Sequence, residues 1–222
     1  MIATLLASVR SWWGLQDPVA SSDAERWVVV DVETSGLDAK NDRLLAIAAI
    51  GLRVGPGPAS RPEIVLGDSF EVVLRQEAVS HRDNILLHGI GEQRQRDGVE
   101  PATALQAFVD FIGEAPLLAF HSAFDETLID RHCRRHLGRR LVNPWLDLAH
   151  LCAVTHEEVR ARSLDDWMAH FGILCPARHQ ASADTLATAE LLLRLWPRIA
   201  PEGGRWRDAV RLAGRRRWLA GR

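Results

Sequence analysis

One run of valines that ends in two acids constrains this chain more than any other feature of its sequence. The run lies in WVVVDVETSGL, residues 27–37. Because its apolar residues are continuous, it predicts a strand buried on both faces, as at the centre of an α/β sheet. Asp31 and Glu33 are two residues apart, so a strand places both carboxylates on one face. Paired buried acids are costly unless a cation offsets them, and divalent metals prefer such oxygen ligands. The alternative is a simple turn that ends the strand.

Two further positions carry chemically useful side chains at predicted element boundaries. Asp125 follows the apolar strand 116–120 and opens a helix at 124–137. Strand-to-helix junctions are where α/β proteins bind ligands, although an acid in a first helical turn is also stabilised by the helix dipole. His179 and Asp184 lie in HQASADT at the start of a helix over 184–196, where a lone histidine is more often a surface or capping residue.

The remaining pattern indicates strands first and then alternating helices and strands. We expect a linker at 17–26, strands at 43–54, 63–75 and 145–146, and a helix opened by Pro101. Further helices are expected at 147–154, after Ser163, and up to a stop at Pro197. This order predicts a mixed sheet with helices on its faces.

Composition excludes a polycation and a membrane-spanning chain. Net charge is −2 over 222 residues, and no apolar run is long enough to cross a bilayer. Cys133, Cys152 and Cys175 form no C-x-x-C pair, so we interpret them as small buried residues in a reducing, cytoplasmic environment. Charge is uneven, with arginine clusters at 131–140 and in the last twenty residues. Each cluster suits either phosphate contact or a solvated helical face.

The chain divides by pattern into three parts. Residues 1–24 comprise a predicted amphipathic helix and a linker, residues 25–200 a catalytic-type domain, and residues 201–222 an arginine-rich tail. Three roles are open for the first and last parts of the chain. These segments dock a polymerase, mediate formation of a dimer, or cover the domain.

Taken together and in order, the acidic segments resemble the DEDDh exonucleases, which include the epsilon proofreading subunit of bacterial DNA polymerase III. The resemblance runs from about Trp27 to Trp196 and extends to segments such as LLHGIGEQ and ADTLATAELLLRL. It implies a ribonuclease H-like α/β fold with a central mixed five-stranded sheet flanked by helices. Ser122 and Gly91 depart from the family pattern, which leaves substrate fit open. We interpret His121 as structural and Asp147 as a helix cap.

The resemblance also implies an activity and its residues. These enzymes remove nucleotides from the 3′ end of nucleic acid with two divalent metal ions, Mg²⁺ or Mn²⁺. Asp31, Glu33, Asp125 and Asp184 match the four metal-binding acids, and His179 matches the general base. Expected substrate contacts are Val32, Glu33, Thr34, Leu37, Phe124 and His179. Single-stranded DNA is the favoured substrate. The alternatives are an RNA-trimming exoribonuclease and a non-catalytic nucleic-acid-binding or polymerase-accessory module.

Overall fold

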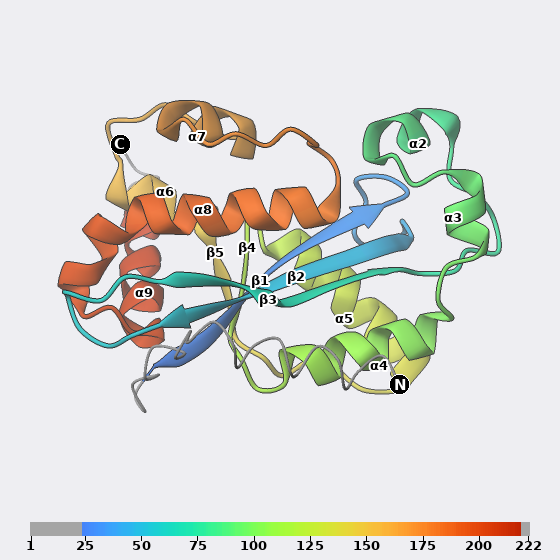
Figure 1. Ribbon diagram of the computed structural model, residues 1–222, viewed down its shortest axis with the longest axis horizontal. Helices are drawn as coiled ribbons and strands as arrows, with labels where there is room; N and C mark the ends of the chain where they lie inside the picture. The colour runs from blue at the N-terminus through green and yellow to red at the C-terminus, as the bar shows by residue number, and fades with distance from the viewer. Residues whose placement is uncertain (1–23, 219–222) are drawn as a thin grey trace, which may run out of the picture.

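A mixed five-stranded sheet with helices on both faces forms the centre of the molecule (Figure 1). A computed structural model describes residues 24–218. Strand order is β3-β2-β1-β4-β5. The strands are β1 (Glu25–Thr34), β2 (Leu44–Val54), β3 (Glu63–Val73), β4 (Leu117–Ala119) and β5 (Trp145–Asp147). The pairs β1–β2 and β2–β3 are antiparallel, while β1–β4 and β4–β5 are parallel. The predicted ribonuclease H-like α/β fold is confirmed.

The valine run of β1 packs into two separate hydrophobic clusters, one on each face of the sheet. Val28 and Val30 join the cluster built with α4 (Pro101–Ile112) and α5 (Ala123–Leu137). Trp27 and Val29 join the cluster built with α8 (Ala181–Ile199). Since successive side chains alternate between faces, burial on both sides is what a continuous apolar run requires.

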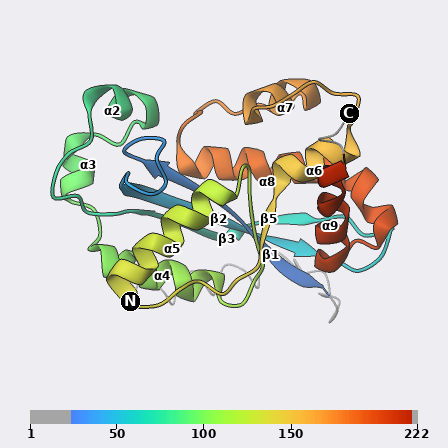
Figure 2. The ribbon, with the colours of Figure 1, turned by 180° about the vertical axis from the view of Figure 1, so that it is seen from behind.

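The helices divide between the two faces (Figure 2). On the α8 face lie α6 (Leu148–Thr155), α7 (Leu164–Phe171) and α9 (Trp206–Ala213), with the short 3₁₀ segments η2 (Ala200–Glu202) and η3 (Gly214–Trp218). Beyond the ends of β1 and β2 lie α2 (Arg82–His88) and α3 (Glu92–Arg96). Within residues 24–218, no helix has the length and apolar character needed to span a bilayer.

Two local expectations are wrong, and two helices were not expected. Helix α8 does not stop at Pro197 but continues to Ile199, because Trp196 and Ile199 are both buried and hold the last turn in place. Strand β1 begins at Glu25, inside the expected linker, because Glu25 and Arg26 pair with β2. The sequence gave no expectation for α2 and α3, whose residues are mostly polar and lack helical periodicity.

The described part of the arginine-rich tail packs on the domain. Trp206 lies edge-on to Trp27 with ring centroids 5.1 Å apart, and Ala209 and Leu212 are buried in the α8-side cluster. Four tail arginines form ion pairs, Arg205 with Glu25 of β1 and the others with Glu202 or Asp208 of the tail itself: Arg205, Arg207, Arg211 and Arg215. These contacts favour covering of the domain. The predicted amphipathic helix at 1–15 lies outside the described residues, and the three-part division stays a prediction.

His132 is held neutral inside α5 and supplies a stability prediction. Its Nδ1 lies 2.8 Å from the Leu128 carbonyl oxygen, and its Nε2 accepts from the Leu44 backbone N–H at 3.4 Å. Burial, reinforced by the charge of Arg131, lowers the pKa of His132 to about 4. Protonation therefore favours the unfolded chain, and stability is lost as pH falls from about 6.5 to about 4.

We expect the unfolding free energy of the His132→Gln variant to lose about 3 kcal/mol less than that of the wild type over this pH interval. The measurement is urea unfolding at several pH values. His81→Gln, which changes an exposed histidine, is the control and should follow the wild type. Parallel curves for all three proteins would show that His132 does not titrate in this way.

Candidate metal centre

Carboxylates from the first strand and the last long helix meet at one end of the sheet. Asp31 and Glu33 occupy the end of β1, and Asp184 lies in the first turn of α8. Each offers an oxygen, and the three oxygens all lie within 4.8 Å of one another. The two acids of β1 share the strand face of Trp27 and Val29, which packs under α8. The alternation of β1 therefore places both acids at the start of this helix. Figures 1 and 2 both show the end of β1 near the start of α8.

Asp125 supplies a fourth acid from the other face of the sheet. It is buried in the first turn of α5, and its charge raises the pKa of Asp31. The pKa of Asp125 itself is raised to about 8 by burial, against the opposing backbone N–H of Asp125. The structure thus places three of the predicted acids in one cluster and Asp125 near enough to raise the pKa of Asp31 and Glu33.

The electrostatics of the cluster favour a bound cation. Burial is the largest cause that raises the pKa of Asp31 well above its ordinary value, and repulsion from Asp125 and Glu33 adds to it. Burial and repulsion from Asp184 raise the pKa of Glu33 to about 8. Arg178, which pairs with Asp184, offsets part of this repulsion, but the pKa values of Asp31 and Glu33 stay raised. Ionising the cluster at neutral pH is therefore still costly without a further positive charge. Its donors are all carboxylate oxygens, the ligands that Mg²⁺ and Mn²⁺ prefer, so the residues fit the implied metals.

His179 reaches the cluster through its backbone. Its N–H donates to Asp184 Oδ2 at 3.1 Å, and its φ of 61° lies in the left-handed region. The imidazole is exposed. Asparagine and histidine are among the residues enriched in this backbone region. The structure therefore anchors the loop of His179 on a candidate metal ligand and leaves the ring facing solvent.

The residues expected to contact substrate differ in how much of each side chain is exposed to solvent. Leu37 is 93% exposed just beyond the end of β1. Val32 and Phe124 are partly buried and pack against the α4–α5 cluster, which limits the area of each that faces outward. The Thr34 hydroxyl donates to the Gly36 carbonyl and shapes the turn after the acids. Among these residues, Leu37 is the most accessible apolar surface.

The sequence analysis did not predict that four further residues near the acids belong to the site. Arg178 forms ion pairs with Asp184 and Asp165. Cys175, expected to be buried, is half-buried with its Sγ 3.6 Å from Asp184 Oδ1. Asn84 of α2 donates to the Thr34 carbonyl at 2.8 Å and ties that helix to the end of β1. Asp147 caps α6 as predicted, but it also accepts the His121 N–H at 3.0 Å. Only the position of Asp147 at a strand end was visible in the sequence.

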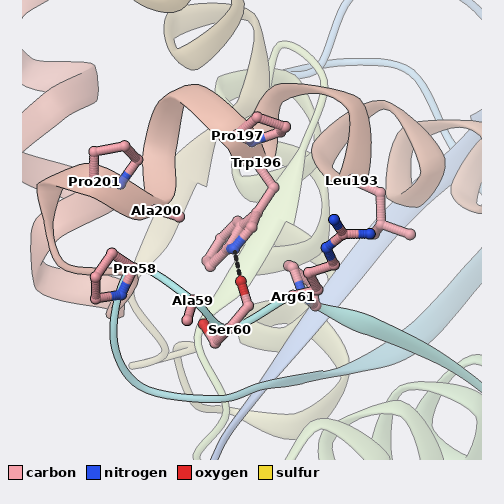
Figure 3. Close-up of a pocket in the computed structure, with 10 residues that line it drawn as sticks. Pro58, Ala59, Ser60, Arg61, Leu193, Trp196, Pro197, Ala200 and Pro201 are labelled. Atoms are coloured by element: carbon pink, nitrogen blue, oxygen red, sulfur yellow. Dashed lines mark hydrogen bonds between the residues drawn. The ribbon is translucent and has the colours of Figure 1, made fainter.

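A separate hollow of about 520 Å³ lies between the β2–β3 loop and the C-terminal end of α8 (Figure 3). Four prolines and Trp196 line it, and the Trp196 indole N–H donates to the Ser60 carbonyl at 2.8 Å. The residues that line it include no acid. It lies at the end of α8 opposite Asp184 and contributes nothing to the acidic cluster.

The mixed sheet has a ribonuclease H-like fold, with the four acids near one end of its central strand. The chain belongs to the exonuclease family RNase_T, which matches residues 28–192. The match contains all four acids and His179.

Relatives and solved structures agree with this assignment. DNA polymerase III PolC-type of Clostridium perfringens is 30% identical over 173 residues, 76% of this chain and 11% of that protein. A DNA polymerase III subunit epsilon-like protein of Rhodobacter capsulatus is 32% identical over 184 residues, 82% of this chain and 25% of that protein. E. coli exonuclease I in complex with a dT13 oligonucleotide has a similar fold, with a TM-score of 0.63 and 19% identity over 78% of this chain and 41% of that chain. The chain thus spans a tenth to a quarter of the length of these polymerase-related proteins.

Asp147, the last residue of β5, is hydrogen-bonded to the segment 121–125 that contains Asp125, and this contact supplies a second prediction. Its Oδ1 accepts from the His121 N–H, where φ is 62°, and from the Ala149 N–H at 2.9 Å. His121 lies just before α5, so this bond positions the turn that delivers Asp125. We expect Asp147→Ala to lower the unfolding free energy by about 1–2 kcal/mol, as loss of a helix cap does. It should also reduce kcat.

Asp147→Asn keeps an oxygen that can accept both N–H groups, so it should retain most of the stability and the activity. Urea unfolding and steady-state hydrolysis on the same preparations make the comparison. Equal losses in the alanine and asparagine variants would contradict positioning through these hydrogen bonds.

Proposed function

We propose that this protein is a metal-dependent 3′→5′ exonuclease that releases nucleoside monophosphates from single-stranded nucleic acid, with DNA favoured. One observation carries the proposal: three carboxylate oxygens from Asp31, Glu33 and Asp184 lie within 4.8 Å of one another. Burial and mutual repulsion raise the pKa of Glu33 to about 8, so the cluster is costly unless it serves to hold cations.

Each residue has a definite role in this proposal. Asp31, Glu33 and Asp184 would hold Mg²⁺ or Mn²⁺, and Asp125 would hold the second ion directly or through water. When bound, such ions generate a nucleophile at neutral pH and stabilise charge on the leaving oxygen. His179 would accept a proton from the attacking water at an imidazole nitrogen. Its N–H bond to Asp184 keeps this loop beside the acids.

Exposed apolar side chains near the acids support a single-stranded end as substrate. Leu37 follows β1 directly, and Leu86 and Leu87 lie on α2, the helix that Asn84 ties to Thr34. Leu37 and Leu86 are 93% and 72% exposed. Bases of a single strand can be splayed apart and packed on such surfaces, whereas a duplex keeps them stacked. Leu37 and Phe124 are the proposed base contacts, together with the backbone around Val32, Glu33 and Thr34.

The deciding experiment is a parallel digestion of single-stranded DNA, duplex DNA and RNA labelled at the 5′ end, with Mg²⁺, with Mn²⁺ and with EDTA. The proposal predicts a ladder of products that shorten from the 3′ end, fastest on single-stranded DNA, and no products in EDTA. Faster digestion of RNA would favour the exoribonuclease alternative. Binding without any hydrolysis would favour a non-catalytic module. A cytoplasmic location and a polymerase or second copy as partner stay predictions.

A further inference from the structure

A basic groove follows the outer side of α5, the helix whose first turn carries Asp125. The groove has a volume of about 700 Å³. Ala123, Glu126 and Thr127 line its end at the first turn of α5, while Asp125 of the same turn is buried on the opposite side of the helix. Four arginines line the rest: Arg131, Arg134, Arg135 and Arg140. Figure 2 shows α5 running from the neighbourhood of α8 toward α4, so the groove runs from the end of the helix that carries Asp125 to the end remote from it.

Three of the four arginines are held in place by interactions within the fold. Asp130 forms ion pairs with Arg134 and Arg140. Although burial raises the pKa of Asp130, the hydrogen bond and charge of Arg134 outweigh it and leave that pKa below its ordinary value. Arg131 donates to the Asp42 carbonyl. Among residues 24–217, Arg135 makes no ion pair. With only Glu126 and Asp130 as acids, the groove keeps an excess of positive charge.

The positive surface continues past the groove. Arg135 also lines a neighbouring hollow of about 200 Å³, together with Arg43, Arg75 and His136. One acid, Glu77, lies among the residues that line that hollow. The helix alone is 15 residues long, which corresponds to about 22 Å. A track of this length and charge suits a repeating polyanion better than a single small anion.

We propose that the basic groove along α5 binds the phosphates of a single strand upstream of its 3′ end. This inference rests on the proposed function, since the groove is assigned to the strand whose end occupies the acidic cluster. An arginine guanidinium group can donate two parallel hydrogen bonds to the oxygens of one phosphate. The backbone phosphates of a strand carry one negative charge per nucleotide. The groove therefore adds affinity for longer strands and takes no part in bond cleavage.

The test removes Arg135 and Arg140, which are exposed and leave the Asp130–Arg134 pair intact. Each phosphate contact on a single strand contributes about 0.7 to the salt slope of binding. The double variant R135A/R140A should therefore lower the slope by about 1.4 and weaken binding of an oligothymidylate roughly 10- to 30-fold at about 0.1 M salt. Fluorescence anisotropy in EDTA measures this without hydrolysis. The matched control, R160A/R162A, removes the same charge from the exposed loop before α7 and should keep the wild-type slope.

A small substrate separates this inference from the proposed function. Hydrolysis of the p-nitrophenyl ester of thymidine 5′-monophosphate uses the acidic cluster without reaching the groove, so R135A/R140A should leave its rate unchanged. A wild-type protein that binds the oligonucleotide but never hydrolyses ester or strand would refute the proposed function. The salt slopes of the two double variants would still show whether the groove binds the strand. Equal slopes for both double variants, or a parallel loss of ester hydrolysis in R135A/R140A, would overturn the groove assignment.

Discussion

Asp31→Asn should abolish exonuclease activity and at the same time stabilise the metal-free protein. Asp31 shares its site with Glu33 and Asp184, and it feels repulsion from Asp125 as well. Losing one carboxylate weakens the hold on both proposed ions, which supply several kcal/mol of stabilisation in such reactions. We expect the rate of strand digestion to fall by at least about 10³-fold. EDTA should abolish wild-type activity, and added Mg²⁺ or Mn²⁺ should restore it.

The gain in stability follows from the direction of the pKa shift. Burial and neighbouring carboxylates raise the pKa of Asp31 in the folded protein, so the folded state binds protons more tightly than the unfolded chain. Stability is therefore lost as pH rises above the ordinary aspartate range. In EDTA, Asp31→Asn should unfold at higher urea than the wild type near neutral pH, and the difference should shrink at acidic pH.

Asp83→Asn is the control for this experiment, since Asp83 is an exposed acid on α2. It should leave both the activity and the urea midpoint unchanged. If Asp31→Asn digests single strands at the wild-type rate, the acids are not the catalytic site.

The central strand and its chemistry were predictable because local sequence dictates them. A valine run needs two buried faces, and β1 has them. The D-x-E spacing fixes which face carries the acids, so Asp31 and Glu33 follow from alternation alone. The proximity of Asp31 and Glu33 to Asp125 and Asp184 depends on the parallel pairing of β1 with β4 and on the packing of α8. Residue spacing alone does not predict these tertiary contacts. The family resemblance supplied that step.

The interactions that support the site were not predictable for a different reason. Arg178, Cys175 and Asn84 act through tertiary contacts between segments that no local pattern connects. The left-handed backbone of His121 and His179 gave no signal either, because that conformation is most often marked by glycine. The stop expected at Pro197 failed because burial of the last helical turn outweighed one missing backbone donor.

His179 is expected to govern the rate of hydrolysis without governing metal affinity. Its backbone N–H contacts Asp184, while its exposed imidazole is free to accept a proton. Removal of a general base typically costs about 10²- to 10⁴-fold in kcat. The backbone at this position has a φ of 61°, so alanine there adds strain. His179→Asn is the sharper variant, because asparagine tolerates this conformation, keeps the N–H bond and carries no titratable base.

We expect both His179→Asn and His179→Ala to lose about 10²- to 10⁴-fold in kcat, while calorimetric Mn²⁺ binding by His179→Asn stays at the wild-type affinity. The wild-type rate should rise through an inflection as pH increases, since only a neutral imidazole accepts a proton. Ionisation of the acids contributes its own pH dependence, because the pKa values of Glu33 and Asp125 are raised. The asparagine variant separates the two causes: the histidine inflection should vanish, whereas any contribution from the acids persists. An asparagine variant that keeps the full rate and the inflection would assign the proton transfer to another group, even with the fold and the acidic cluster unchanged.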